Sequence, residues 1–192
     1  EPQQFADRLA TCGVRKTSQI IAYDDSGGIY AARLWWLARW LGHNAVAVLN
    51  GGWNTWVSEE HPVSPDIPAP GNGDFKAVLQ AGGVDVDFVL NNLGSPEIQI
   101  LDARAEDRFQ GENETRDPVG GHIPGALNRF FRHNLDANGR FKTDGQLRDE
   151  FACVLRDTKP AAIVHQCGSG VTACHNLLAM EIAGLSGSRL YA

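Results

Sequence analysis

The stretch that decides the fold reads Ala161-Ala162-Ile163-Val164-His165-Gln166, followed directly by Cys167-Gly168-Ser169-Gly170-Val171-Thr172-Ala173. Its first six residues are mainly apolar and predict a buried strand, and residues 172–183 predict a helix. A strand that passes through a glycine-bearing loop into a helix is typical of an α/β sheet, in which ligands bind beyond the carboxyl ends of the strands. We therefore expect Cys167 at the ligand-binding edge of a mainly parallel sheet.

Cys167 is the candidate nucleophile of this loop. Backbone N–H groups of the loop and the positive end of the helix dipole can converge on its sulfur and favour the thiolate, which is the form that attacks. The alternative is a buried structural cysteine, because cysteine is among the most buried residue types. The strand–loop–helix context favours the nucleophile.

Two other kinds of cysteine site do not fit the loop. A tyrosine phosphatase needs an arginine six positions after the cysteine to grip phosphate, and that position holds Ala173. A thioredoxin-type site needs a second cysteine in a Cys-x-x-Cys motif, and that position holds Gly170. What remains is a single thiolate suited to carrying a small group such as a sulfane sulfur.

Three motifs together resemble those of a known family. They are the loop Cys167–Ala173, the segment Gly121-His122-Ile123-Pro124-Gly125-Ala126, and Leu101-Asp102-Ala103-Arg104. In this order the chain resembles the rhodanese superfamily, and more narrowly the two-domain 3-mercaptopyruvate and thiosulfate sulfurtransferases. The resemblance implies an α/β fold of tandem rhodanese-like domains, each a mainly parallel sheet flanked by helices, with the first domain incomplete.

The resemblance also implies site residues. Gly168 and Ser169 stand where the thiosulfate type carries Arg-Lys, so the loop is similar to the mercaptopyruvate type. Ser169 would be a hydrogen-bond partner in catalysis, and the persulfide would be held by backbone N–H groups of the loop, with Gly168, Gly170, Val171 and Thr172 as binding residues. Arg108 and Arg116 would bind the carboxylate and ketone of mercaptopyruvate, as a guanidinium fork matches a carboxylate. The alternative for both arginines is a solvated loop residue paired with Glu112, Glu114 or Asp117.

Three further residues have structural interpretations. Arg104 follows Asp102 at a predicted strand end, which favours an ion pair with that carboxylate. His122 is expected to fix the turn of its motif rather than to act as a base. His165 belongs to the predicted buried strand.

Composition excludes several function classes. The chain has 192 residues, a net charge of −6 and 43% apolar residues, which argues against nucleic-acid binding as its main task. No stretch approaches the roughly 20 apolar residues that span a bilayer. The four cysteines are scattered without zinc spacing, so neither a metal nor a cofactor is expected, and the pattern favours a reducing cytoplasm.

An internal repeat is visible when the chain is shifted by 142 residues. Residues 20–50 then align with residues 162–192 without a gap, and Cys167 falls on Asp25. The first copy contains a predicted helix over residues 29–41 and a predicted strand over residues 46–49. Because it keeps the loop but lacks the sulfur nucleophile, we expect it to be inactive.

The domain organisation follows from the repeat and from a region rich in proline and glycine. We expect a partial inactive rhodanese-like domain over residues 1–60 and a linker over residues 61–74. A catalytic rhodanese-like domain should cover residues 75–192, begin with a strand over residues 75–79 and be truncated at its C-terminus. By the resemblance, the chain is expected to be an interior part of a longer protein.

The function expected from the resemblance is sulfur transfer from 3-mercaptopyruvate to a thiol or cyanide through a persulfide. A thioredoxin-like reductant is a candidate partner. Neither nucleic acid nor a membrane is expected as a partner. Two alternatives stay open. One is a thiosulfate:cyanide sulfurtransferase, and the other is a non-catalytic rhodanese-like binding or regulatory module.

Overall fold

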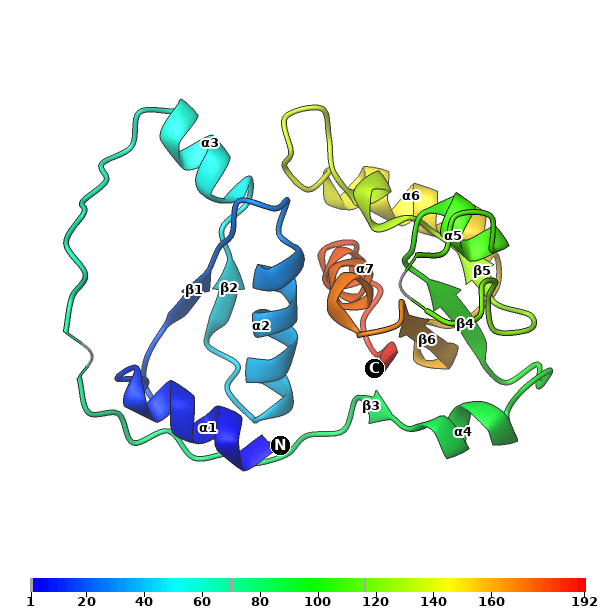
Figure 1. Ribbon diagram of the computed structural model, residues 1–192, viewed down its shortest axis with the longest axis horizontal. Coiled ribbons are helices and arrows are strands. Elements are labelled where there is room, and N and C mark those ends of the chain that lie inside the picture. Colours follow the sequence, from blue (N-terminus) through cyan, green and yellow to red (C-terminus); the bar gives the residue numbers. More distant parts are fainter. Residues whose placement is uncertain (1, 70, 116) are drawn as a thin grey trace. The chain divides into compact units, whose positions relative to one another are not determined.

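The computed structural model describes residues 2–69, 71–115 and 117–192, and the chain divides into two compact units (Figure 1). Unit 1 is Glu1–Ala81 and unit 2 is Gly82–Ala192. Among the described residues, no helix combines the length and apolar character that crossing a membrane would require.

Unit 1 is built around a short parallel sheet. Its elements are α1 (Pro2–Thr11), β1 (Ile20–Ala22), α2 (Ile29–Trp40), β2 (Val46–Val48) and α3 (Gly52–Ser58). Strands β1 and β2 pair in parallel with Ile20 opposite Val46. The helix and strand expected over residues 29–41 and 46–49 are therefore confirmed within one residue.

The segment after the proline-rich stretch (residues 61–74) packs into unit 1. Phe75 is buried in one cluster with Leu9 and Leu41, and the Val78 backbone N–H donates to Leu41 O at 2.9 Å. Residues 75–79 form no strand. The division between the units thus falls after Ala81, later than the boundary expected before Phe75, because these apolar residues fill the core of the first unit.

Unit 2 contains a five-stranded parallel sheet in the order β3-β7-β6-β4-β5. The elements, in chain order, are β3 (Gly83–Val84), α4 (Val86–Asn91), β4 (Gln99–Asp102), α5 (Glu106–Gln110), β5 (Leu127–Asn128), η1 (Phe131–Asn134), α6 (Asp144–Leu155), η2 (Pro160–Ala162), β6 (Ile163–Gln166), α7 (Val171–Ile182) and β7 (Arg189–Tyr191).

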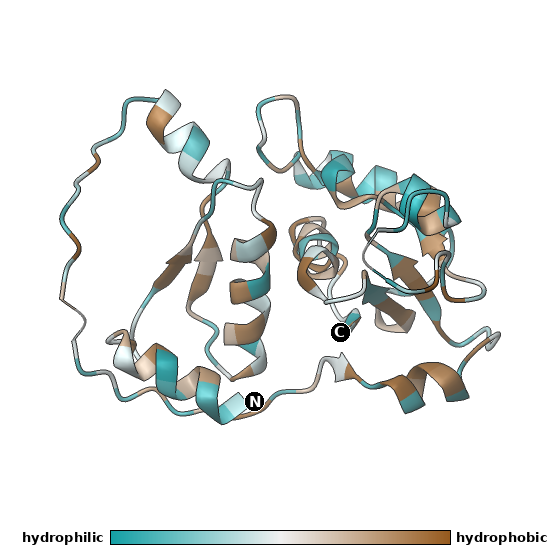
Figure 2. Ribbon diagram, viewed as in Figure 1, coloured by the Kyte–Doolittle hydropathy of each residue, from teal (hydrophilic) through white to brown (hydrophobic). Residues whose placement is uncertain are grey.

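Helices cover both faces of this sheet. On one face, Leu101 and Ile163 pack with Phe151 of α6 and Met180 of α7. On the other face, strand residues pack against Val89 of α4. Strands β1 and β2 consist of apolar residues, whereas α6 carries hydrophilic residues along much of its length (Figure 2). The predicted α/β class, with parallel strands flanked by helices, is confirmed.

The strand register sets the position of the site. Asp102 at the end of β4 lies opposite Gln166 at the end of β6. Because the two strands are parallel, the residues that follow them emerge at the same edge of the sheet. Cys167 therefore starts its loop beside the segment that begins with Ala103.

His165 is the buried titratable group of β6. Its side chain is inaccessible to solvent, and its Nε2 lies 3.1 Å from Ser188 Oγ. No hydrogen-bond partner for Nδ1 occurs among the residues that the structure describes. Burial lowers the pKa of His165 from 6.5 to about 3, so the imidazole is neutral in the folded protein, and the structural interpretation of this residue is confirmed.

This burial predicts a pH dependence of stability. The stabilising contribution should be complete above pH 6.5 and should be lost as pH falls from 6.5 towards 3, because the unfolded chain binds a proton that the folded chain excludes. The loss should approach about 1.4 kcal/mol per pH unit. Urea unfolding of wild type and His165→Gln between pH 7.5 and 5 measures it; the variant should lack this component of the slope. Parallel pH profiles for the two proteins would contradict the prediction.

Candidate active site

Cys167 stands at the junction of a buried strand and a helix, as predicted. Strand β6 ends at Gln166, and α7 begins at Val171 after a loop of four residues, which we call the nucleophile loop (Cys167–Gly170). Gly168 has φ 117° and the N-cap Gly170 has φ 74°, a left-handed backbone that favours glycine. The chain turns there directly into the first turn of α7, whose N–H groups lack intrahelical acceptors.

Exposure differs along this loop. Cys167 is 7% exposed, whereas Gly168 and Ser169 are exposed to solvent and Val171 and Thr172 are half-buried. The sulfur is thus held within the fold while the next two residues form the rim. This burial is compatible with a nucleophile reached through the rim, and also with the structural alternative.

A buried ion pair joins the nucleophile strand to the segment that follows β4. The Asp102 carboxylate, fully buried, accepts from Arg104 Nη2 at 2.7 Å, from Arg104 Nε and from Gln166 Nε2. Arg104 Nη2 also donates to Gly121 O at 2.7 Å. The hydrogen bond and charge of Asp102 raise the pKa of Arg104 above its ordinary value. The predicted ion pair of Arg104 with Asp102 is confirmed, and its carboxylate also binds the side chain of Gln166, the residue before Cys167.

Arg108 reaches from α5 into the acidic loop (residues 111–121). Its Nη2 donates to Glu114 Oε1 and Oε2 at 2.9 Å each, and lies 3.3 Å from Asp117 Oδ2. The sequence is compatible with Arg108 either as a substrate-binding residue or as a loop residue paired with a carboxylate. In the structure it is paired with Glu114 and Asp117. Arg116, the second arginine expected to bind substrate, lies outside the described residues.

A cavity of about 260 Å³ brings the two loops together. The nucleophile strand and loop contribute Gln166 and Gly168, and the facing wall contributes Arg104 and Asp117. The remaining lining residues belong to the chain after Asp117: Val119, Gly120, Gly121, His122 and Ile123. The cavity therefore places one guanidinium, that of Arg104, and one carboxylate, that of Asp117, beside the rim of the nucleophile loop.

His122 fixes the turn in which it lies. Its Nδ1–H donates to Phe109 O at 2.8 Å, and its ring stacks on the Phe109 ring with centroids 3.7 Å apart. The turn-fixing interpretation of His122 is confirmed by these contacts.

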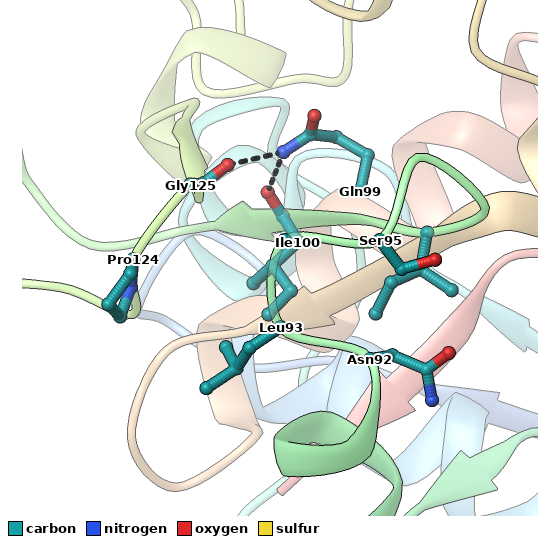
Figure 3. A pocket seen from close by; sticks show the side chains of 9 residues that line it. Asn92, Leu93, Ser95, Gln99, Ile100, Pro124 and Gly125 are labelled. Carbon is teal, nitrogen blue, oxygen red and sulfur yellow. Dashed lines mark hydrogen bonds between the residues drawn. The ribbon is translucent and has the colours of Figure 1, made fainter.

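A second cavity of about 220 Å³ lies at the other end of the strands (Figure 3). It surrounds the start of β4, where Gln99 Nε2 donates to Ile100 O and to Gly125 O. Because β4 and β6 are parallel, this position is opposite to the edge that carries Cys167. None of the predicted site residues lines it.

The corresponding loop of unit 1 has the same backbone plan. A shift of 142 residues carries α2 onto α7 with identical bounds, and the N-cap Gly28 has φ 88°, ψ 6°, close to the 74° and 0° of Gly170. Asp25 takes the position of Cys167. The Asp24 carboxylate accepts four backbone N–H groups, those of Ser26, Gly28, Tyr30 and Ala31, at 2.8–2.9 Å. The backbone N–H groups of this loop therefore bind an anion that belongs to the chain itself, the Asp24 carboxylate.

Sequence reasoning missed the place of Asp117 beside the nucleophile loop. Glycines at both ends of the acidic loop offered a signal. A Cβ on Gly111 would lie 2.8 Å from Gly121 N, so the two ends of the loop touch, and Glu114 and Asp117 between them lie beside Arg104. Among the described residues, no group of three or more His, Cys, Asp or Glu side chains is arranged to hold a metal ion.

Comparison with known proteins gives one consistent result. The family model "Rhodanese-like domain" matches residues 1–59 and 85–191. A probable 3-mercaptopyruvate sulfurtransferase of Pseudomonas aeruginosa is 42% identical, over 100% of this chain and 68% of that protein. A thiosulfate sulfurtransferase of Bos taurus is 38% identical, over 97% of this chain and 65% of that protein. The chain thus spans about two thirds of the length of these relatives.

Solved structures agree with the sequence comparisons. The crystal structure of SseA from Escherichia coli, described as a 3-mercaptopyruvate sulfotransferase, matches with a TM-score of 0.85 and 33% identity over 100% of this chain and 72% of that one. A 3-mercaptopyruvate sulfurtransferase from Leishmania major matches with a TM-score of 0.80 and 29% identity, over 99% of this chain and 53% of that one.

Proposed function

The chain belongs to the rhodanese family, and we propose that it is a sulfurtransferase that carries sulfur from 3-mercaptopyruvate to a thiol or cyanide as a persulfide on Cys167. One observation carries the proposal: Cys167 is a single thiol between a parallel strand and a helix N-terminus, beside a cavity that Arg104 and Asp117 line. The names of the relatives support the same reaction class.

The proposed reaction has two balanced steps. The Cys167 thiolate attacks the sulfur of 3-mercaptopyruvate, an S–S bond forms, and the C–S bond breaks. Its electron pair goes to the methylene carbon, which gains the proton of the substrate thiol, so pyruvate leaves. The persulfide then gives its outer sulfur to cyanide, forming thiocyanate, or to a thiol, and the Cys167 thiolate returns. This is covalent catalysis that divides one transfer into two.

The remaining residues have supporting roles in this proposal. Ser169, exposed beside Cys167, is the hydrogen-bond partner of the reacting sulfur. Backbone N–H groups of Gly168, Gly170, Val171 and Thr172 stabilise the persulfide anion. Arg108 and Arg116 bind the carboxylate and ketone of the donor. For this, the guanidinium of Arg108 must release one of the protein carboxylates that it contacts and bind the carboxylate of the substrate instead. Neither a metal nor an organic cofactor takes part.

Unit 1 is proposed to be an inactive copy of unit 2. The identical bounds of α2 and α7 under one shift support a repeat. Asp25 stands in the position of the nucleophile, and Asp24 fills the cradle of N–H groups. We further propose that the protein works in the cytoplasm, where its thiol stays reduced and a thioredoxin-like protein is available as acceptor.

Mercaptopyruvate is preferred over thiosulfate as donor because Gly168 and Ser169 bring no cation to the rim of the loop. A thiosulfate:cyanide sulfurtransferase is the second candidate, supported by the bovine relative. An intact cysteine in the nucleophile loop argues against a purely binding or regulatory module.

The nucleophile role predicts the effect of one substitution. Cys167→Ser should abolish sulfur transfer from 3-mercaptopyruvate to cyanide, with a loss of at least about 10³-fold, because serine does not form the persulfide. The matched control is Cys153→Ser, which alters an exposed cysteine of α6 and should keep full activity. Thiocyanate formation measures both. Substantial turnover by Cys167→Ser would refute the assignment.

The donor-binding role of Arg108 predicts a selective kinetic change. Arg108→Gln should raise KM for 3-mercaptopyruvate about tenfold or more with a smaller change in kcat, because a charge-assisted bidentate contact is lost. Arg148→Gln removes the same charge from the exposed surface of α6 and should leave KM unchanged. An unaltered KM in Arg108→Gln would contradict the role.

A further inference from the structure

We propose that Asp117 is a specificity-determining residue of the donor site: its carboxylate occupies the anion position at Arg108 and selects against donors of high negative charge. This inference rests on the proposed function, which it deepens by naming a residue that separates mercaptopyruvate from thiosulfate.

The Asp117 carboxylate lies between two arginines and the nucleophile loop. Asp117 Oδ2 lies 3.3 Å from Arg108 Nη2 and 4.0 Å from Arg104 Nη1. It is also the atom nearest to the point where a Cβ on Gly168 would lie, at 3.9 Å. One oxygen thus faces two guanidinium groups and the rim of the nucleophile loop, within the cavity that Gly168 lines. A donor that reaches Cys167 past this rim meets that negative charge.

Among the described residues, two carboxylates contact the guanidinium of Arg108, and their surroundings differ. The Glu114 side chain is 4% exposed and contacts both Arg104 and Arg108, so it belongs to the buried framework. The Asp117 side chain is 47% exposed, and exposed ion pairs are weak. Asp117 is therefore the carboxylate that a substrate anion can displace from Arg108.

The charge of the donor decides how strongly Asp117 opposes it. Coulomb repulsion scales with the charge of the incoming group, so a dianion is opposed about twice as strongly as a monoanion at the same distance. Thiosulfate is a dianion with its charge adjacent to the transferred sulfur. Mercaptopyruvate carries a single carboxylate, separated from its sulfur by two carbons. Asp117 should therefore penalise thiosulfate more, in addition to the missing cations at Gly168 and Ser169.

The kinetic test compares two variants that each remove one negative charge from the acidic loop. Asp117→Asn should raise kcat/KM for thiosulfate relative to that for 3-mercaptopyruvate by about fivefold, and the effect should shrink at high salt. Glu112→Gln, at an exposed position outside the cavity, should leave the ratio unchanged. An unchanged ratio in Asp117→Asn, or an equal change in both variants, would overturn the proposal.

A second readout does not depend on turnover. Iodoacetate is an anion and iodoacetamide is neutral, and both alkylate a thiolate. Asp117→Asn should increase the rate ratio of iodoacetate to iodoacetamide at Cys167 about threefold, measured by mass spectrometry with fragmentation that separates Cys167 from Cys174. Glu112→Gln should not change it.

The two experiments separate the two hypotheses. If neither donor is turned over by wild type, the sulfurtransferase proposal fails, while the alkylation ratio still decides whether Asp117 controls the approach of anions. If turnover occurs but either ratio is the same in wild type and Asp117→Asn, the role of Asp117 is refuted and the sulfurtransferase proposal stands.

Discussion

The buried pair of Asp102 and Arg104 is the interaction on which the site depends. One carboxylate at the end of β4 binds the Arg104 guanidinium and the side chain of Gln166, the residue before Cys167. Arg104 in turn binds Gly121 O and contacts Glu114. Removing one partner of such a pair costs about 3–5 kcal/mol, because the other charge stays buried without compensation. The nucleophile loop and the acidic loop are thus held by a single set of charges.

The two units share one backbone arrangement but differ in the residues that face its N–H groups. Each has a parallel strand, a glycine with positive φ and a helix of the same length. In unit 1, the Asp24 carboxylate accepts the N–H groups of the loop, so its anion is built in. In unit 2, the strand position equivalent to Asp24 holds Gln166, whose side chain donates to Asp102 instead. The residue before Cys167 therefore brings no carboxylate of its own to the N–H groups of the nucleophile loop, in keeping with the proposed persulfide.

Much of this arrangement was predictable from local patterns. The strand and helix around Cys167 and the pairing of Arg104 follow from periodicity and charge. The placement of Phe75 did not follow, because an apolar run does not reveal which core it enters. The partner of Arg108 also stayed open, since it depends on how the glycines at the ends of the acidic loop meet. Strand β5 and helix η1 are too short to produce a periodic signal. The features that the sequence did not predict depend on contacts between residues far apart in the chain or on very short elements, and local propensity does not report either.

The persulfide is the most direct test of the account. Protein incubated with 3-mercaptopyruvate, in the absence of an acceptor, should gain about 32 Da, one sulfur, on the peptide that contains Cys167, and fragmentation should place it on that residue. Addition of cyanide should remove the gain and release thiocyanate. Folded protein that gains no sulfur at Cys167 from this donor, or gains it on another cysteine, would contradict the mechanism.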